Sequence, residues 1–234
     1  MRLLDELISS LSHSDEKVKD VRVGVSWIGV LSRNLGLAKT YLPPHGFKVK
    51  DAGRLIGKSA LELAEYSKSW NLIEAGIGVA ALNSLIEPTG EKINVLDFII
   101  GKGKGRKICM VGHFPRMEEI REAAQELWVL EKTPQPGDFP DTAAEYLIPQ
   151  ADIVAITGSA LVNKSLQRLL ELSQGYTIVF GPSAPMSEVL LDWGVNMIGG
   201  TKVINLESAL LKISQGGNMV PQFKREFEFL VMRR

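Results

Sequence analysis

The fold is decided by the stretch ICMVGHFPRMEEIREAAQELWVLE, which occupies residues 108–131. It opens with an apolar run from Ile108 to Val111, continues through a helical pattern from Met117 to Glu126, and closes with a second apolar run from Leu127 to Leu130. Continuous apolar runs are typical of strands that are covered on both faces. The stretch therefore predicts a strand, a helix and a second strand, which is the repeating unit of a parallel sheet.

The same alternation continues to the end of the chain. Further apolar runs are expected to be strands, at Ile153 to Ile156, Thr177 to Phe180 and Val195 to Ile198. Each precedes a helical pattern, at Val162 to Leu172, Met186 to Trp193 and Leu206 to Ile213. Thr142-Ala-Ala-Glu145 predicts a capping box that opens another helix, and Phe223 to Val231 predicts a final edge strand. Strands joined by right-handed helical crossovers make a Rossmann-like parallel sheet.

The first part of the chain has a different pattern. Met1 to Leu11 has the apolar spacing of an amphipathic helix, and Val21 to Trp27 alternates like a half-buried strand that Ser32-Arg33-Asn34 would turn into a second strand. Helices should begin at Ser59 and at Asn71, and the second is so apolar that it must be buried. We expect a small α+β module in residues 1–95, followed by the Rossmann-like domain in residues 96–234.

Composition limits the partners and the location. The 27 basic and 27 acidic residues cancel, so no field of one sign would attract nucleic acid or anionic lipid. The first 20 residues include early acidic residues and no long apolar region, unlike a signal peptide, and no apolar stretch reaches the ~20 residues of a bilayer span. The single cysteine, Cys109, cannot form an internal disulfide. These features predict a cytoplasmic protein without a nucleic-acid or membrane partner.

Small residues cluster where the predicted strands end. These residues are Gly112, Thr157-Gly158-Ser159, Gly181-Pro182-Ser183 and Gly199-Gly200. In an open α/β sheet, ligands bind beyond the carboxyl ends of the strands, and small residues let them approach the backbone. The N–H groups of the helices that follow suit a phosphate or a carboxylate. Any one of these segments could be an ordinary turn, but together they predict a ligand cleft.

Two side chains at these strand ends could be reactive. Glu131 ends the second strand, where a Rossmann acid accepts hydrogen bonds from ribose. The preceding loop, Gly112-His-Phe-Pro-Arg116, lacks the GxGxxG fingerprint, so a mononucleoside-type ligand such as S-adenosylmethionine fits better than a dinucleotide. His113 could be a general base, or could bind a divalent transition metal together with Glu131 or Asp138. With three histidines and no CxxC or HxxxH spacing, a structural zinc site is not expected.

Five segments, taken in order, match a known family. They are Gly76-Ile-Gly-Val-Ala-Ala-Leu-Asn83, Val111-Gly-His-Phe-Pro115, Glu131 with Gly137-Asp138, Thr157-Gly-Ser-Ala-Leu-Val-Asn163 and Gly181-Pro-Ser-Ala-Pro185. They resemble the putative heavy-metal chelation domain family, a prokaryotic group of largely unknown function. The resemblance covers nearly the whole chain. It implies an enolase N-terminal-like module followed by a Rossmann-like domain, with the candidate site in the cleft between them.

Two functions fit these observations, and a third option is an interaction protein whose cleft is vestigial, against which the small polar residues at the strand ends argue. In the first, the protein binds a small anionic or metal-chelating ligand in the cleft, for heavy-metal chelation or metal-dependent chemistry, and His113 and Glu131 react or coordinate. The strand ends at Thr157 to Ser159 and Gly181 to Ser183 would then bind anionic oxygens.

In this first function Asn83 and Asn163 would orient the ligand. The second function is a nucleoside- or S-adenosylmethionine-binding module without a metal, in which Glu131 holds the ribose. The substrate, the reaction and whether the chain is an enzyme at all stay open. An apolar surface on the first module would suit a homodimer.

Overall fold

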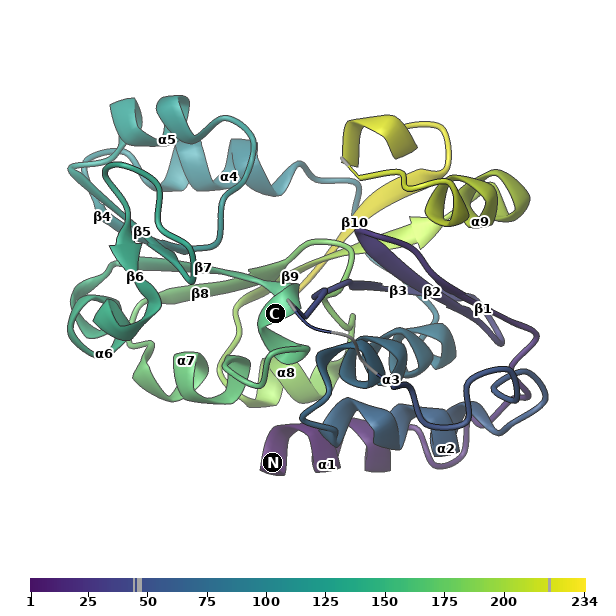
Figure 1. The fold of residues 1–234 in the computed structure, drawn as a ribbon. Helices are drawn as coiled ribbons and strands as arrows, with labels where there is room; N and C mark the ends of the chain where they lie inside the picture. Colours follow the sequence, from purple (N-terminus) through teal and green to yellow (C-terminus); the bar gives the residue numbers. More distant parts are fainter. Residues whose placement is uncertain (44, 46–47, 219) are drawn as a thin grey trace.

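The computed structural model describes residues 1–43, 45, 48–218 and 220–234, and their strands form two sheets (Figure 1). The smaller sheet is antiparallel and has the order β1-β2-β3. Its strands are β1 (Asp20–Val23), β2 (Trp27–Leu31) and β3 (Leu35–Lys39). The larger sheet has seven strands, which are β4 (Lys107–Val111), β5 (Glu126–Glu131), β6 (Phe139–Pro140), β7 (Ile153–Thr157), β8 (Tyr176–Phe180), β9 (Met197–Val203) and β10 (Phe227–Arg233).

The strand order of the larger sheet is β10-β9-β8-β7-β4-β5-β6. All neighbours are parallel except β10, which pairs antiparallel with β9 at the edge. Counted along the chain from β4, the parallel strands have the order 3-2-1-4-5-6 of a doubly wound sheet. The order therefore reverses between β4 and β7. The structure confirms the predicted fold class, a mostly parallel α/β sheet preceded by a small α+β region.

Helices cover both faces of the larger sheet (Figure 1). One face carries α4 (Val95–Lys102) and α5 (Met117–Ala123), which pack on the inner side chains of β4, β7 and β8. The other face carries α6 (Ala144–Leu147), α7 (Leu166–Leu172) and α8 (Glu188–Asp192). Short 3₁₀ segments complete the connections, at Asp141–Ala143, Ile148–Gln150, Gly158–Leu161 and Val220–Phe223.

The N-terminal module, comprising α1 to α3 and β1 to β3, is built around one buried helix. Its helical segments are α1 (Arg2–Ser10), α2 (Ala60–Ala64), the 3₁₀ segment Glu65–Lys68 and α3 (Leu72–Leu85). The predicted caps are confirmed, because the Ser59 side chain accepts from the Glu62 amide and the Asn71 side chain accepts from Ile73 and Glu74. As expected, α3 is buried on almost every side.

Two glycines let backbones approach α3 closely. A Cβ atom at Gly36 of β3 would lie 2.0 Å from the Ala80 carbonyl oxygen, and one at Gly78 would lie 1.9 Å from the Ser67 amide nitrogen. Any larger side chain would collide with main-chain atoms at either position. The sheet that carries β3 is therefore pressed directly onto α3.

Four local expectations are wrong. Residues 21–27 do not form one strand, because β1 ends at Val23 and β2 begins at Trp27. A tight turn joins the two strands, in which the Gly24 amide donates to the Trp27 carbonyl at 2.9 Å. Thr142 does not cap α6, whose preceding helical turn starts after Pro140, and Glu145 instead pairs with Arg168 at 2.6 Å.

The third correction concerns the helix expected at residues 162–172. It begins only at Leu166, because Lys164 adopts a left-handed backbone conformation with φ of 69° that interrupts the helix. Glu126, which was expected to end a helix, instead begins β5. The amphipathic first helix and the final edge strand are confirmed as α1 and β10.

The N-terminal module and the larger sheet share their buried residues. One apolar cluster joins α1 and α3 to α7 and α8, and a second joins β2 and β3 to α9 (Leu206–Ser214) and β10. Polar bonds cross the same junction, since the Trp193 indole donates to Glu6 at 2.6 Å. The division into residues 1–95 and 96–234, and the likeness of the first part to an enolase N-terminal module, stay predictions. Within the described residues, no helix is long and apolar enough to cross a membrane.

Candidate functional site

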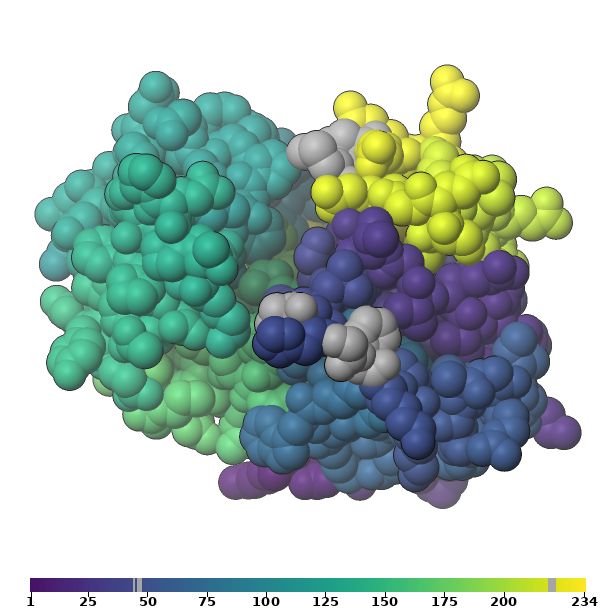
Figure 2. Space-filling view, viewed as in Figure 1, coloured from purple at the N-terminus to yellow at the C-terminus, as the bar shows by residue number. Residues whose placement is uncertain are grey.

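A large cleft opens where the strand order reverses. It has a volume of about 1340 Å³ and lies between the carboxyl ends of the parallel strands and the N-terminal module, and Figure 2 shows the hollow between these two parts. The reversal point of a doubly wound sheet is the usual place for a ligand. The cleft is larger than the roughly 300–1000 Å³ typical of small-molecule pockets, so it has room for an organic ligand.

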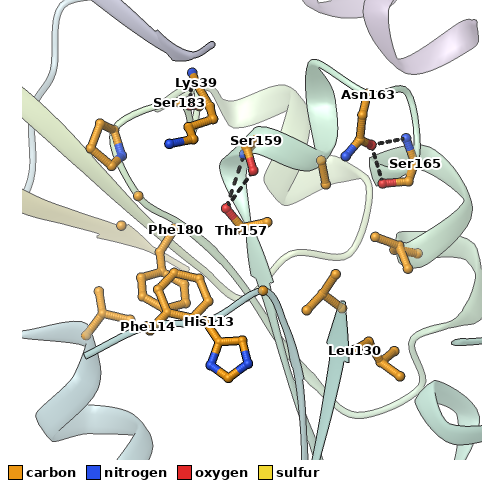
Figure 3. Close-up of a pocket in the computed structure, with 18 of the residues that line it drawn as sticks. Lys39, His113, Phe114, Leu130, Thr157, Ser159, Asn163, Ser165, Phe180 and Ser183 are labelled. Carbon is orange, nitrogen blue, oxygen red and sulfur yellow. Dashed lines mark hydrogen bonds between the residues drawn. The ribbon is translucent and has the colours of Figure 1, made fainter. Parts of the chain in front are cut away.

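The wall formed by the strand ends, which we call the sheet wall, carries a chain of hydroxyl groups (Figure 3). The Thr157 and Ser159 hydroxyl oxygens lie 3.0 Å apart. Tyr41, from the opposite side, donates to the Ser159 hydroxyl at 3.1 Å, and the Asn163 amide donates to the Tyr41 oxygen at 3.3 Å. These four side chains are thus held in fixed positions on the cleft surface.

The β4 and β8 ends need glycine for different reasons. Gly112 has φ of 103° and a Cβ atom there would lie 3.2 Å from the Thr157 methyl group, so both its conformation and its space exclude larger residues. Gly181 has φ of 110° and open space around it. A positive φ is a conformation that glycine adopts at little cost. Both strand ends can therefore turn sharply and leave backbone exposed to the cleft.

His113 is held by two acidic residues. Its ring nitrogen Nε2 lies 2.7 Å from Asp138 Oδ2, and its backbone amide donates to Glu131 Oε1 at 3.0 Å. Asp138 is 4% exposed and also accepts from the Gln135 amide at 2.8 Å. Burial raises the pKa of Asp138, but these hydrogen bonds outweigh burial and hold the pKa below its usual value. Within the described part of the chain, the His113 Nδ1 atom has no partner, so it is free to accept or donate toward a ligand.

Glu131 is less free than the sequence suggested. One oxygen accepts from the His113 amide, and the other accepts from the Lys132 amide at 3.2 Å. The carboxylate therefore links the end of β5 to the loop after β4, although it still lines the cleft and keeps further lone pairs.

Nine of the eleven predicted site residues line the cleft. They are His113, Glu131, Gly112, Thr157, Ser159, Asn163, Gly181, Pro182 and Ser183. Gly158 lies behind the surface, where a Cβ atom would be 2.3 Å from the Ala184 amide nitrogen. Asn83 also lies outside the lining, and its amide donates to the Leu37 carbonyl at 2.9 Å and to the Ser183 carbonyl at 3.2 Å. Asn83 thus ties β3 to the β8 loop, and a role for it in orienting a ligand stays a prediction.

The opposite wall was missed by sequence reasoning. It is formed by the ends of β2 and β3, and its main residues are Trp27, Lys39 and Tyr41; we call it the module wall. The backbone amide of Lys39 donates to the Ser183 hydroxyl at 2.9 Å, which fixes the two walls to each other. Lys39 and Ser183 lie next to each other in Figure 3. The sequence held only a weak signal for this wall, since Lys39 ends a run of strand residues like any other.

The cleft also has an aromatic part. Phe114 stacks on Phe180 with ring centroids 4.0 Å apart and an angle of 19° between the rings, and both residues line the cleft (Figure 3). Leucines from several elements continue this apolar surface, namely Leu96, Leu130, Leu169, Leu172 and Leu230. A ligand in the cleft would therefore contact hydroxyl groups on one side and apolar groups on another.

The donor set does not fit a metal held by the protein alone. Among the described residues, no three His, Cys, Asp or Glu side chains converge on a point where they could hold a metal ion. Cys109 is fully buried in β4, and burial raises the pKa of its thiol to about 12, so it supplies no thiolate to the cleft. The predicted metal ligands bond to one another instead. The His113 ring is bonded to the Asp138 carboxylate, and the Glu131 carboxylate accepts from the His113 backbone amide.

Comparisons with known proteins cover the whole chain. Two family models, both described as "Putative heavy-metal chelation", match residues 4–86 and residues 94–233. An uncharacterized protein of Methanocaldococcus jannaschii is 27% identical, over 88% of this chain and 87% of its own length.

Two crystal structures of proteins of unknown function are also similar. That of Desulfitobacterium hafniense has a TM-score of 0.86 and 27% identity, covering 100% of this chain and 97% of the other. That of Pyrococcus horikoshii has a TM-score of 0.83 and 23% identity, covering 100% and 98%. The second likeness concerns the fold alone.

Proposed function

This chain belongs to the family described as "Putative heavy-metal chelation", and we propose that it binds a small anionic or metal-chelating ligand in the cleft between the N-terminal module and the larger sheet. The observation that carries this proposal is the cleft itself, which lies at the reversal of strand order and has fixed hydroxyl groups on its surface. Hydroxyl groups and the exposed amides of glycine turns are suited to anionic oxygens.

The donor geometry favours an organic ligand over a bare ion. A tight site for a soft metal needs thiolate or imidazole groups that converge, and the described residues offer His113 alone at the cleft surface. A metal would therefore enter already held by its chelator. In that arrangement His113 Nδ1 could complete the coordination or take a proton from the ligand, while Asp138 fixes the orientation of the ring.

A thermal-shift experiment tests this function. We would measure the melting temperature with nickel chloride, with sodium citrate, with the preformed nickel citrate complex, and with a panel of organic carboxylates and phosphates. A ligand at one hundred times its dissociation constant should stabilise the protein by about 2.7 kcal/mol, which is a readily detected shift. We expect anions or chelates to stabilise the protein and nickel alone not to do so. A panel in which no anion and no chelate raises the melting temperature would contradict the proposal.

The variants follow from the geometry. His113→Ala should weaken binding of the chelate without unfolding the protein, because His113 is 34% exposed. His13→Ala is the matched control, since His13 lies outside the cleft lining. Equal binding by both variants would remove His113 from the site.

A second function has one observation in its favour. Glu131 ends β5 and lines the cleft, at the place where the acid of a doubly wound fold binds ribose hydroxyls. The chain would then bind a nucleoside or S-adenosylmethionine without metal. This function predicts a stabilising effect of S-adenosylmethionine or adenosine that survives a chelator and is lost in Glu131→Gln.

A further inference from the structure

The charges that line the cleft are almost all paired. Three of its four lysine and arginine side chains bind a carboxylate that also lines the cleft: Lys92 binds Glu228, Lys132 binds Asp141 at 2.9 Å, and Arg168 binds Glu145 at 2.6 Å. Each of these three cations is more than half exposed, at 74%, 53% and 55%. They belong to the rim, where ion pairs are well solvated.

Lys39 differs from them in every respect. It is half-buried at the end of β3, and within the described residues its ammonium group has neither a carboxylate partner nor a hydrogen-bond acceptor. The ammonium nitrogen lies over the face of the Trp27 ring, 5.4 Å from the ring centroid. Burial lowers the pKa of Lys39, as expected for a cation that has lost water without gaining a counter-ion.

The remaining acidic groups of the cleft cannot neutralise Lys39. Glu131 already accepts hydrogen bonds from the His113 and Lys132 amides, and Asp138, which lies outside the cleft lining, is bonded to the His113 ring. The wall around Lys39 holds neutral groups, chiefly the Ser183 hydroxyl and the Trp27 ring. Among the described residues, the cleft interior therefore has one uncompensated positive charge, and a ligand with one negative charge would balance it.

The rest of the cleft interior indicates what kind of molecule carries the negative charge of the ligand. The stacked pair of Phe114 and Phe180 and the leucines that line other parts of the cleft offer aromatic and aliphatic surface to a ligand body. Aromatic rings prefer offset stacked or edge-on partners. A carboxylate carries one charge at neutral pH, whereas a phosphate monoester carries nearly two.

We propose that Lys39 is the anion receptor of the cleft and that the ligand is an aromatic monocarboxylate, whose carboxylate binds the Lys39 ammonium while its ring lies against the apolar surface at Phe114. This inference rests on the proposed function, ligand binding in the cleft, and adds the chemical class of the ligand. Lys39 is here a binding residue, and no reaction is assigned to it.

The experiment compares probes of equal shape and different charge. Dissociation constants for benzoate, benzamide and phenyl phosphate would be measured by ligand-observed NMR with the full chain. We expect benzoate to bind at least tenfold more tightly than neutral benzamide, and phenyl phosphate to have no advantage over benzoate. Lys39→Met should abolish the preference for benzoate over benzamide, and Lys39→Arg should retain part of it.

The control is Lys92→Met, which removes a cation from the same cleft that is already paired with Glu228. It should leave the preference for benzoate unchanged. Circular dichroism and the melting temperature would show that each variant is folded before binding is compared.

Other outcomes separate the two proposals. Equal binding of benzoate and benzamide by the wild-type protein, or an unchanged preference in Lys39→Met, would overturn the role of Lys39 and leave cleft binding in place. A tenfold preference for phenyl phosphate would overturn the single-charge class. If no probe binds, and no anion or chelate of the thermal-shift panel binds either, both the inference and the proposed function fail.

Discussion

The two walls of the cleft are built on different principles. On the sheet wall, Thr157 bonds to Ser159 and Ser159 accepts from Tyr41, so the polar groups have partners before a ligand arrives. On the module wall, Lys39 reaches the cleft without an acidic partner among the described residues. The comparison teaches that the sheet supplies shape and a fixed polar surface, while the docked module supplies the charge. Each prediction below removes or isolates one part of this division.

The largest effect should come from separating β3 from α3, which together support the module wall. Gly36→Ala places a Cβ atom 2.0 Å from the Ala80 carbonyl oxygen and 2.3 Å from the Ser84 amide nitrogen, so a main chain must move. We expect a loss of about 3 kcal/mol in the free energy of unfolding, at the upper end for overpacked sites. For a chain of this size the melting temperature would fall by roughly 6–12 °C.

Gly101→Ala is the control for this prediction. No heavy atom lies within 4 Å of a Cβ at Gly101, which is part of α4. Alanine there should leave stability unchanged or raise it by up to about 1 kcal/mol. Equal melting temperatures of Gly36→Ala and Gly101→Ala would contradict the close packing of β3 on α3.

The next effect should come from cutting the tie between the two walls. Asn83→Ala removes the donors to the Leu37 and Ser183 carbonyls and leaves both acceptors unpaired. We expect a cost of about 2 kcal/mol in chemical denaturation. Among the described residues the Asn83 side-chain oxygen has no partner, so the hydrogen bonds that the variant loses are those of the amide nitrogen.

Asn34→Ala provides the comparison for Asn83. The Asn34 amide makes one hydrogen bond, to the Ile86 carbonyl at 3.1 Å, inside the N-terminal module. Its loss should cost about 1 kcal/mol. A smaller effect at Asn83 than at Asn34 would show that Asn83 does not hold the two walls together.

The sheet wall was largely predictable and the module wall was not. Buried strands announce themselves by continuous apolar runs such as Ile153 to Ile156, and the topology of a parallel sheet places their ends on one edge. His113, Thr157 and Ser183 follow from that rule without knowledge of any contact. Lys39 faces the cleft only because the N-terminal module docks on the β8 loop, and no local pattern encodes that docking.

The smaller errors have two kinds of cause, an unusual backbone conformation or a partner that is distant in the sequence. The turn at Gly24 and the helix break at Lys164 depend on backbone conformations that periodicity does not report. The capping box at Thr142 failed because Glu145 makes an ion pair with Arg168, a residue of a later helix. Sequence reasoning therefore succeeded where burial decided the outcome and failed where a distant partner did.

A smaller effect, a loss of about 1 kcal/mol in the free energy of unfolding, should appear when the Asp138 carboxylate that bonds to the His113 ring is removed. The folded-state pKa of Asp138 lies below its unfolded value of ~3.9, so its contribution to stability is complete above that value and is lost as the pH falls through the folded pKa. Asp138→Asn should thus be less stable than the wild-type protein at pH 7, and the difference should begin to shrink below about pH 4 and close as the pH falls through the folded pKa of Asp138. Urea denaturation at several pH values measures this.

Asp141→Asn controls for charge removal alone. Asp141 pairs with Lys132 on the exposed rim, and breaking such a pair should cost less than about 0.5 kcal/mol. A difference between wild type and Asp138→Asn that does not change as the pH falls below about 4 would contradict the assigned hydrogen bond to His113.

The smallest effect should come from Lys39 in the unliganded protein. Loss of its contact with Trp27 and relief of its desolvation oppose each other, so Lys39→Met should change the free energy of unfolding by no more than about 0.5 kcal/mol. Guanidinium denaturation of this variant beside Lys92→Met measures it. A loss of several kcal/mol would make Lys39 a structural residue of the module wall.

The position of Cys109 has a practical consequence. Its thiol lies between Trp128 of β5 and Val154 of β7, and it is the only thiol of the chain. Alkylating and disulfide reagents attack the thiolate form of cysteine. In the closed sheet, burial raises the pKa of the Cys109 thiol, so little thiolate forms, and it also keeps the reagent away from the sulfur. The rate at which such a reagent modifies the protein therefore reports how often the centre of the sheet opens, and a ligand that holds the two walls together should slow that reaction without touching the sulfur.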